Sequence, residues 1–174
     1  MRVKLIAIFF ATFLLSSCGQ TVGEADIDFN SDIEAIGIGV AKFQENTSKS
    51  GSVDTFEDFV AISENNGLIL DEIDASTDKF LSNIERASSK LPEVDTVESP
   101  SKSKLLAWAE GYKSWIYYQK QNQVIGEDCV RRASEWMSCL IENLSTTSQN
   151  ESSSTIKLTA AIEGIQEWRK LAGQ

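Results

Sequence analysis

Residues 102–123 read KSKLLAWAEGYKSWIYYQKQNQ and carry the clearest periodic pattern in the chain. Bulky side chains recur there every three or four residues, which places them on one face of an α-helix. They are Leu105, Trp108, Tyr112, Trp115 and Ile116. Aromatic side chains at this spacing pack into a core or, as the alternative, form a stacking platform for a ligand. The segment predicts a long helix with its aromatic stripe in a helical core.

The same spacing continues on both sides of this segment. It predicts further helices over residues 31–46, 54–66, 68–91 and 155–172, and one that ends near residue 145. The first opens with Ser31-Asp-Ile-Glu34, a capping box that satisfies reciprocal backbone donors. We therefore predict an all-α fold, a helical bundle of about five to six helices. Its expected core contains Phe43, Phe80, Ile84, Trp108, Tyr112, Trp115 and Trp168.

Three stretches are expected to interrupt the helices. At Asn65-Asn66-Gly67 the helix is expected to stop or to kink. Residues 92–101 are bounded by both prolines, and residues 146–154 are polar and rich in serine and threonine. The first helix also contains Ile36-Gly-Ile-Gly-Val40, in which the glycines allow close approach of a neighbouring helix. The alternation of that pentapeptide leaves a short strand as an alternative.

The N-terminus has the pattern of an export signal. A basic start, Met1-Arg-Val-Lys4, precedes an apolar run of eleven residues from Leu5 to Leu15. A membrane-spanning helix needs about 20 apolar residues, so this run fits the hydrophobic region of a signal peptide instead. The sequence therefore predicts a cleaved signal peptide over residues 1–17.

Leu15-Ser-Ser-Cys18 resembles the lipobox of bacterial lipoproteins. In that family a lipid is attached to the cysteine thiol, and the peptide is cut just before the cysteine. The resemblance implies that Cys18 is the lipidated first residue, which holds the protein on a membrane through its acyl chains. Gly19 in the next position implies the outer membrane, facing the periplasm. An ordinary signal peptide followed by an unrelated cysteine is the alternative.

These predictions divide the chain into a signal peptide over residues 1–17, a lipidated tether over 18–30 and a single helical domain over 31–174. The mature chain would have 157 residues and a net charge of −12. As a flexible coil, the tether would span roughly 20 Å.

The composition excludes several classes of function. The chain has 26 acidic and 16 basic residues, no histidine, and a net charge of −10. Nucleic-acid binding needs clustered lysine and arginine, so no nucleic-acid partner is expected. The absence of histidine removes the commonest general base and metal ligand. We expect no metal, no cofactor and no catalytic residues.

Cys129 and Cys139 are the two cysteines outside the lipobox, and an exported chain favours their oxidation. In one continuous helix they would lie about 15 Å apart, whereas a disulfide needs Cα atoms within about 7 Å. A disulfide therefore requires a turn between Val130 and Ser134, and two free thiols in an unbroken helix are the alternative. We predict the disulfide.

Negative charge is concentrated in the first half of the mature chain. Residues 18–100 hold 18 acidic and 5 basic residues, and residues 101–174 hold 8 and 9. Asp71, Asp74 and Asp78 form one stripe of an expected helix. They are the candidate residues for binding a cationic protein partner, with a solvated surface as the alternative.

Three functions fit these features. The first is a lipid-anchored, non-enzymatic binding or scaffold lipoprotein of the bacterial cell envelope. The second is an inhibitor or immunity protein against a cationic envelope hydrolase or toxin. The third is a hydrolase that uses carboxylates alone, which needs an acidic pair with one raised pKa.

Overall fold

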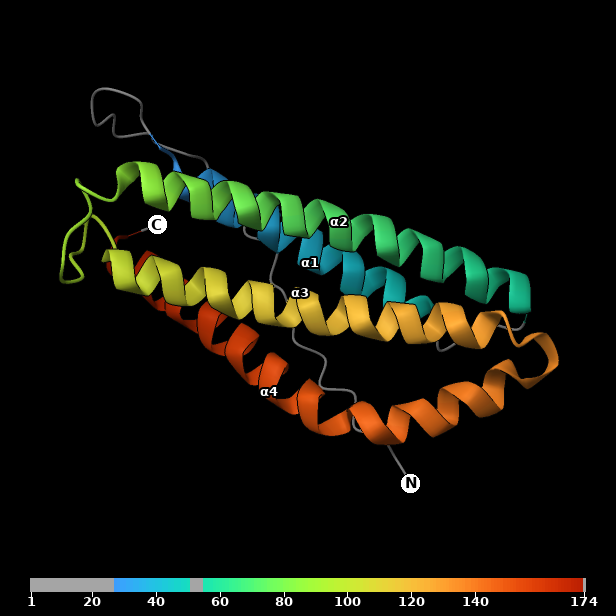
Figure 1. Cartoon of the computed structure of the whole chain (residues 1–174). Coiled ribbons are helices and arrows are strands. Elements are labelled where there is room, and N and C mark those ends of the chain that lie inside the picture. Colours follow the sequence, from blue (N-terminus) through green and yellow to red (C-terminus); the bar gives the residue numbers. More distant parts are fainter. Residues whose placement is uncertain (1–26, 51–54, 174) are drawn as a thin grey trace.

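A computed structural model describes residues 27–50 and 55–173. Helices run alternately up and down, so that each packs against the next along the chain (Figure 1). They are α1 (Phe29–Lys49), α2 (Phe56–Ala87), α3 (Lys102–Val130), the 3-10 helix η2 (Ala133–Glu135) and α4 (Trp136–Leu171). The described residues contain no strand, which confirms the predicted all-α bundle. None of these helices has the apolar stretch that a bilayer crossing requires.

The first helix begins before the predicted boundary. Asp28 caps α1, and its Oδ1 accepts the backbone N–H groups of the next turn at 3.0 and 3.2 Å. Asp32, inside the predicted capping box, is instead buried against α2. There Asn83 Nδ2 donates to its Oδ2 at 2.6 Å, and Lys79 Nζ pairs with its Oδ1 at 2.9 Å. The helical domain therefore includes residues 28–30, which were expected to belong to the tether.

The prediction that α2 is interrupted at Asn65-Asn66-Gly67 is wrong, because the helix continues through this segment. Asn66 Nδ2 donates to Thr47 Oγ1 of α1 at 3.2 Å. Gly67 lies so close to α3 that a Cβ there would overlap Nε2 of Gln123. Asn66 and Gly67 are thus used for packing between helices, and the segment does not end α2.

The loop predicted over residues 146–154 is also helical and lies inside α4. This stretch contains neither glycine nor proline, so its polarity alone does not interrupt the backbone pattern. The spacing in the sequence predicts Ile156, Ala160, Ile165, Trp168 and Leu171 near one buried face of this helix, but Ile156, Ala160 and Leu171 are exposed. The residues that face the bundle are Ser154, Leu158, Ala161, Ile165 and Trp168.

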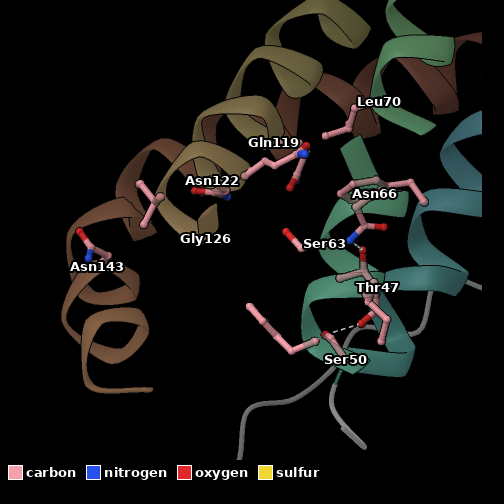
Figure 2. Close-up of a pocket in the computed structure, with 14 residues that line it drawn as sticks. Thr47, Ser50, Ser63, Asn66, Leu70, Gln119, Asn122, Gly126 and Asn143 are labelled. Atoms are coloured by element: carbon pink, nitrogen blue, oxygen red, sulfur yellow. Dashed lines mark hydrogen bonds between the residues drawn. The ribbon is translucent and has the colours of Figure 1, made fainter. Parts of the chain in front are cut away.

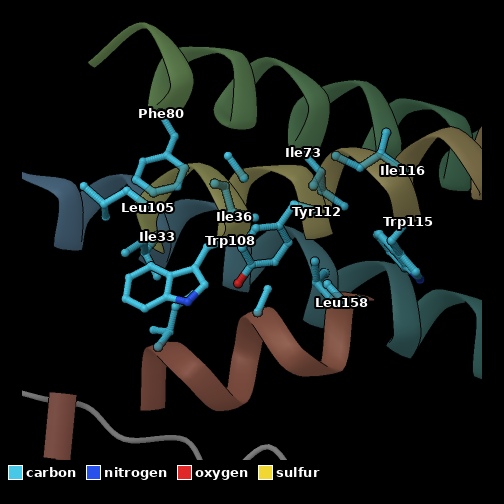
Figure 3. Packing of buried hydrophobic residues seen from close by; sticks show 14 of the residues in the cluster. Ile33, Ile36, Ile73, Phe80, Leu105, Trp108, Tyr112, Trp115, Ile116 and Leu158 are labelled. Carbon is cyan, nitrogen blue, oxygen red and sulfur yellow. The ribbon is translucent and has the colours of Figure 1, made fainter. Parts of the chain in front are cut away.

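The core follows the predicted aromatic stripe. All seven large side chains expected there are buried, and Figure 3 shows Phe80, Trp108 and Tyr112 among the aliphatic residues of α1 and α2. Trp115 meets Phe43 edge to face, with ring centroids 5.3 Å apart. These large side chains belong to the buried cluster that packs α3 against α1, α2 and α4.

The linker between α2 and α3 is fixed by Asp95. Its Oδ1 accepts the backbone N–H of Ser101 at 2.8 Å, and its Oδ2 pairs with Lys104 Nζ at 2.9 Å. These contacts, led by the backbone hydrogen bond, lower the pKa of Asp95 to about 2. Ser101 also caps α3, so the linker and the helix start are held together.

The predicted disulfide between Cys129 and Cys139 is confirmed, with their Cα atoms 5.4 Å apart. The chain turns after Val130 and passes through η2 before α4 begins. This reversal brings the end of α3 beside the start of α4, as the spacing argument required.

Candidate functional site

Cys18, Gly19 and the predicted signal peptide lie outside the described residues. The other residues selected from the sequence, Asp71, Asp74 and Asp78, lie along α2 where it faces α3.

These aspartates form ion pairs with two lysines of α3. Lys113 pairs with both Asp74 and Asp78, the second at 2.6 Å. Lys120 pairs with Asp71 at 2.9 Å and with Asp74 at 2.7 Å. The side chain of Asp74 is 28% exposed, against 72% for Asp71 and 67% for Asp78. The stripe therefore lies at the edge of the α2–α3 contact, with the carboxylates of Asp71 and Asp78 still accessible.

The pKa values follow from this pairing. Burial alone would raise the pKa of Asp74, but hydrogen bonds from Lys113 and Lys120 outweigh it, and the pKa lies below its usual value. The pKa of Lys120 is raised by its bonds to Asp74 and Asp71. Burial alone would lower the pKa of Lys113, but its bonds to Asp74 and Asp78 raise it. Asp74, Lys113 and Lys120 are therefore all held in their charged forms.

A separate feature is a cavity of about 280 Å³ among the C-terminal part of α1, the first half of α2 and the second half of α3. Asn143 of α4 also lines it. Figure 2 shows Gln119 and Asn122 on α3 and Ser63 and Asn66 on α2 around this space. The apolar part of the lining comes from Phe43, Phe59, Ile62, Leu70 and Ile125.

One wall of the cavity is fixed by a chain of amide hydrogen bonds. Asn46 Nδ2 donates to the carbonyl oxygen of Ile62 at 3.1 Å and to Asn66 Oδ1 at 2.9 Å. Asn66 in turn donates to Thr47 Oγ1 at 3.2 Å (Figure 2). Asn46 is buried, so these bonds hold α1 and α2 in one register beside the cavity.

The end of the cavity lies against an aromatic cluster. Phe59 lines the cavity, and its ring centroid is 5.0 Å from that of Trp136, the first residue of α4. Phe56 also contacts Trp136, with centroids 5.9 Å apart. With the Cys129–Cys139 disulfide, these rings fix the start of α4 near the cavity.

Three polar side chains of the lining have no hydrogen-bond partner in the described part of the chain. They are Ser63, Gln119 and Asn122, and each is half-buried. No described lining residue carries a charge. The site therefore offers neutral donors and acceptors beside an apolar surface, which suits reversible binding of a small polar molecule.

Sequence reasoning did not identify this cavity, although a signal was present. After Trp115 and Ile116, the core-facing positions of α3 pass to Gln119, Asn122 and Gly126 with the helical spacing retained. Amides at positions that should be apolar indicate either a polar contact between helices or a hydrated cavity. Only the structure shows which of them lack a partner.

No cluster of residues able to hold a metal ion occurs within the described ranges. No family model, no curated protein and no solved structure matches the chain.

Proposed function

We propose that the protein is a lipid-anchored, non-enzymatic binding lipoprotein of the bacterial cell envelope, and that the cavity beside Asn66 is its binding site. The observation that carries this proposal is the cavity itself. It lies between helices, has an uncharged lining and presents three half-buried side chains that have no hydrogen-bond partner in the described part of the chain. Such sites between the helices of a bundle are typical of ligand binding.

The two carboxyl groups with resolved pKa shifts, Asp74 and Asp95, do not have the property of a general acid. A carboxyl group that acts as a general acid needs a raised pKa. Asp74 and Asp95 both have lowered values, because each is held by lysine or by backbone N–H groups. These two carboxylates stabilise contacts between elements and are poorly suited to donate a proton.

The anchor is supported by the order of basic start, apolar run and Leu15-Ser-Ser-Cys18 in the sequence. We expect Cys18→Ser to abolish lipidation and to release the chain from washed membranes, measured by fractionation and by mass of the N-terminal peptide. Gln20→Ser is the matched control and should stay on the membrane. A Cys18→Ser chain that resists high-salt washing like the unchanged protein contradicts the anchor.

A second candidate function, inhibition of a cationic envelope hydrolase or toxin, is favoured by a specific observation. Asp71 and Asp78 remain largely exposed despite their ion pairs. They lie in the half of the mature chain that carries most of the negative charge. Such a surface attracts cationic proteins and accelerates their association.

A further inference from the structure

We infer that the cavity binds one neutral sugar ring, held by hydroxyl contacts to Ser63, Gln119 and Asn122. The inference rests on the proposed function, since it assigns a ligand class to the same site. It follows from the size, the charge, the hydrogen-bonding capacity and the apolar surface of the lining.

Size limits the ligand to a single ring. Ligand pockets in proteins usually measure about 300–1,000 Å³. At about 280 Å³ this cavity is at the small end of that range, so it is too small for a long chain to be enclosed.

Charge excludes ionic ligands. A charged group that leaves water needs a paired charge or several hydrogen bonds from charged groups. The described lining supplies none, because its polar members are amides and hydroxyls. The nearby lysines of α3, Lys113 and Lys120, are already paired with aspartates of α2. A neutral ligand is therefore the one that binds without an uncompensated charge.

The hydrogen-bonding groups match hydroxyls. An Asn or Gln amide both donates and accepts, as does a serine hydroxyl. Gln119 and Asn122 lie one helical turn apart on α3, and Ser63 belongs to α2. A ring that carries hydroxyls on several edges can reach both helices, and each hydroxyl can donate or accept as the partner requires.

The apolar surface matches the remaining face of such a ring. Phe59, Ile62 and Leu70 of α2 line the cavity beside the polar groups. A sugar ring presents C–H groups on its faces, which can lie against these side chains while its hydroxyls point to the amides. The bonds from Asn46 to Ile62 and Asn66 fix this wall in advance, which reduces the ordering that binding requires.

The test compares sugars of similar size and different charge. The full chain is purified in a detergent without sugar groups and titrated with N-acetylglucosamine, glucose, glucuronate and glucosamine, the last at about pH 6 so that its amine is protonated. Chemical-shift changes of the side-chain amides of Gln119 and Asn122 report occupancy. We expect the neutral sugars to saturate the site with dissociation constants on the order of 1 mM, and the charged ones not to bind.

Two glycines provide a variant that should block the cavity and a matched control. A Cβ built at Gly126 meets only Ser63 Oγ at 3.9 Å, so Gly126→Leu can fill the cavity without a backbone clash. Gly37 has no atom within 4 Å of its Cβ position, so Gly37→Leu changes a helical glycine away from the cavity. We expect Gly126→Leu to weaken sugar binding at least tenfold and Gly37→Leu to leave it unchanged.

A second pair tests the hydrogen bonds. Asn122→Leu removes a partnerless amide of the lining, and Gln121→Leu removes an exposed amide of the same helix. Only the first should weaken binding, by about fivefold. Binding that survives Gly126→Leu, or no binding by either neutral sugar, overturns the inference. A charged sugar that binds and is blocked by Gly126→Leu overturns the assignment of a neutral ligand but supports the binding site, and the Cys18→Ser fractionation tests the anchor separately.

Discussion

Two glycines of α1 have different surroundings although they are only two positions apart. Gly37 has open space at its Cβ position, whereas a Cβ on Gly39 would lie 2.5 Å from Cγ1 of the buried Ile73. Alanine favours a helix over glycine by about 0.8–1 kcal/mol. We expect Gly37→Ala to raise the free energy of unfolding by up to that amount and Gly39→Ala to lower it, because Ile73 must shift. Urea denaturation measures both, and equal effects would contradict the close approach.

The buried phenol of Tyr112 makes the stability of the fold depend on pH in the alkaline range. Burial raises its pKa to about 12, although the charge of Arg169 acts in the opposite direction. An unfolded tyrosine titrates near 10. The unfolded chain therefore releases this proton first, and stability should fall as pH rises from about 10 towards about 12, by about 2 kcal/mol.

Tyr112→Phe should remove that part of the alkaline loss. Tyr117→Phe is the control, because the Tyr117 side chain is exposed. Both are measured by chemical denaturation over this pH range. An equal alkaline loss in Tyr112→Phe and in the unchanged protein would contradict the role of Tyr112.

The helices show which local signals predict structure and which do not. The spacing of Trp108, Tyr112 and Trp115 predicted the buried face of α3, because few other arrangements bury three large rings. The helix α2 continues through Asn65-Asn66-Gly67. The sequence did not predict this, because the residues that contact the segment, on α1 and α3, are distant from it in sequence. The polar residues 146–154 predict a loop, but polarity without glycine or proline is also compatible with a helix, and the structure has a helix there.

The disulfide between Cys129 and Cys139 stabilises the connection between α3 and α4. Cys129 and Cys139 are both buried, while several residues of the first half of α4, such as Met137 and Ile141, are exposed. Closure of a loop of this size contributes about 2–3 kcal/mol. We expect the double variant Cys129→Ala, Cys139→Ala to lose that amount and to accelerate amide hydrogen exchange at the start of α4. Exchange at Leu158 and Ile165, buried in the core, should change least, and a uniform increase would contradict a local role.

The overall fold was predictable from the sequence, but the cavity was not. The helical bundle follows from apolar periodicity, and the disulfide was predicted from the expected export of the chain together with the spacing of the two cysteines. The cavity depends on three helices meeting so that Ser63, Gln119 and Asn122 lack partners. The stripe of aspartates could be seen in the sequence. Its ion pairs with lysines of α3 could not be predicted, because they depend on how α2 and α3 are aligned along their lengths.

The distribution of charge over the whole molecule leads to the last prediction. Residues 18–100 carry an excess of 13 negative charges, which should steer a cationic protein towards α1 and α2. We expect the association rate with a cationic lysozyme-type hydrolase to fall steeply as salt is raised, because the Debye length shortens. Asp71→Asn with Asp78→Asn should slow association at low salt by several-fold and leave the melting temperature almost unchanged, since both side chains are exposed.

Two further variants separate steering from stability. Asp74→Asn should lower the melting temperature, because Asp74 is the shared partner of Lys113 and Lys120. Glu110→Gln with Glu163→Gln removes the same number of charges from α3 and α4, outside the acidic half, and should slow association less. Stopped-flow fluorescence at several salt concentrations measures these rates. If the unchanged protein shows no salt-sensitive binding to the cationic hydrolase, the inhibitor function is wrong, and the exposed carboxylates then act only on solubility and on repulsion from anionic surfaces.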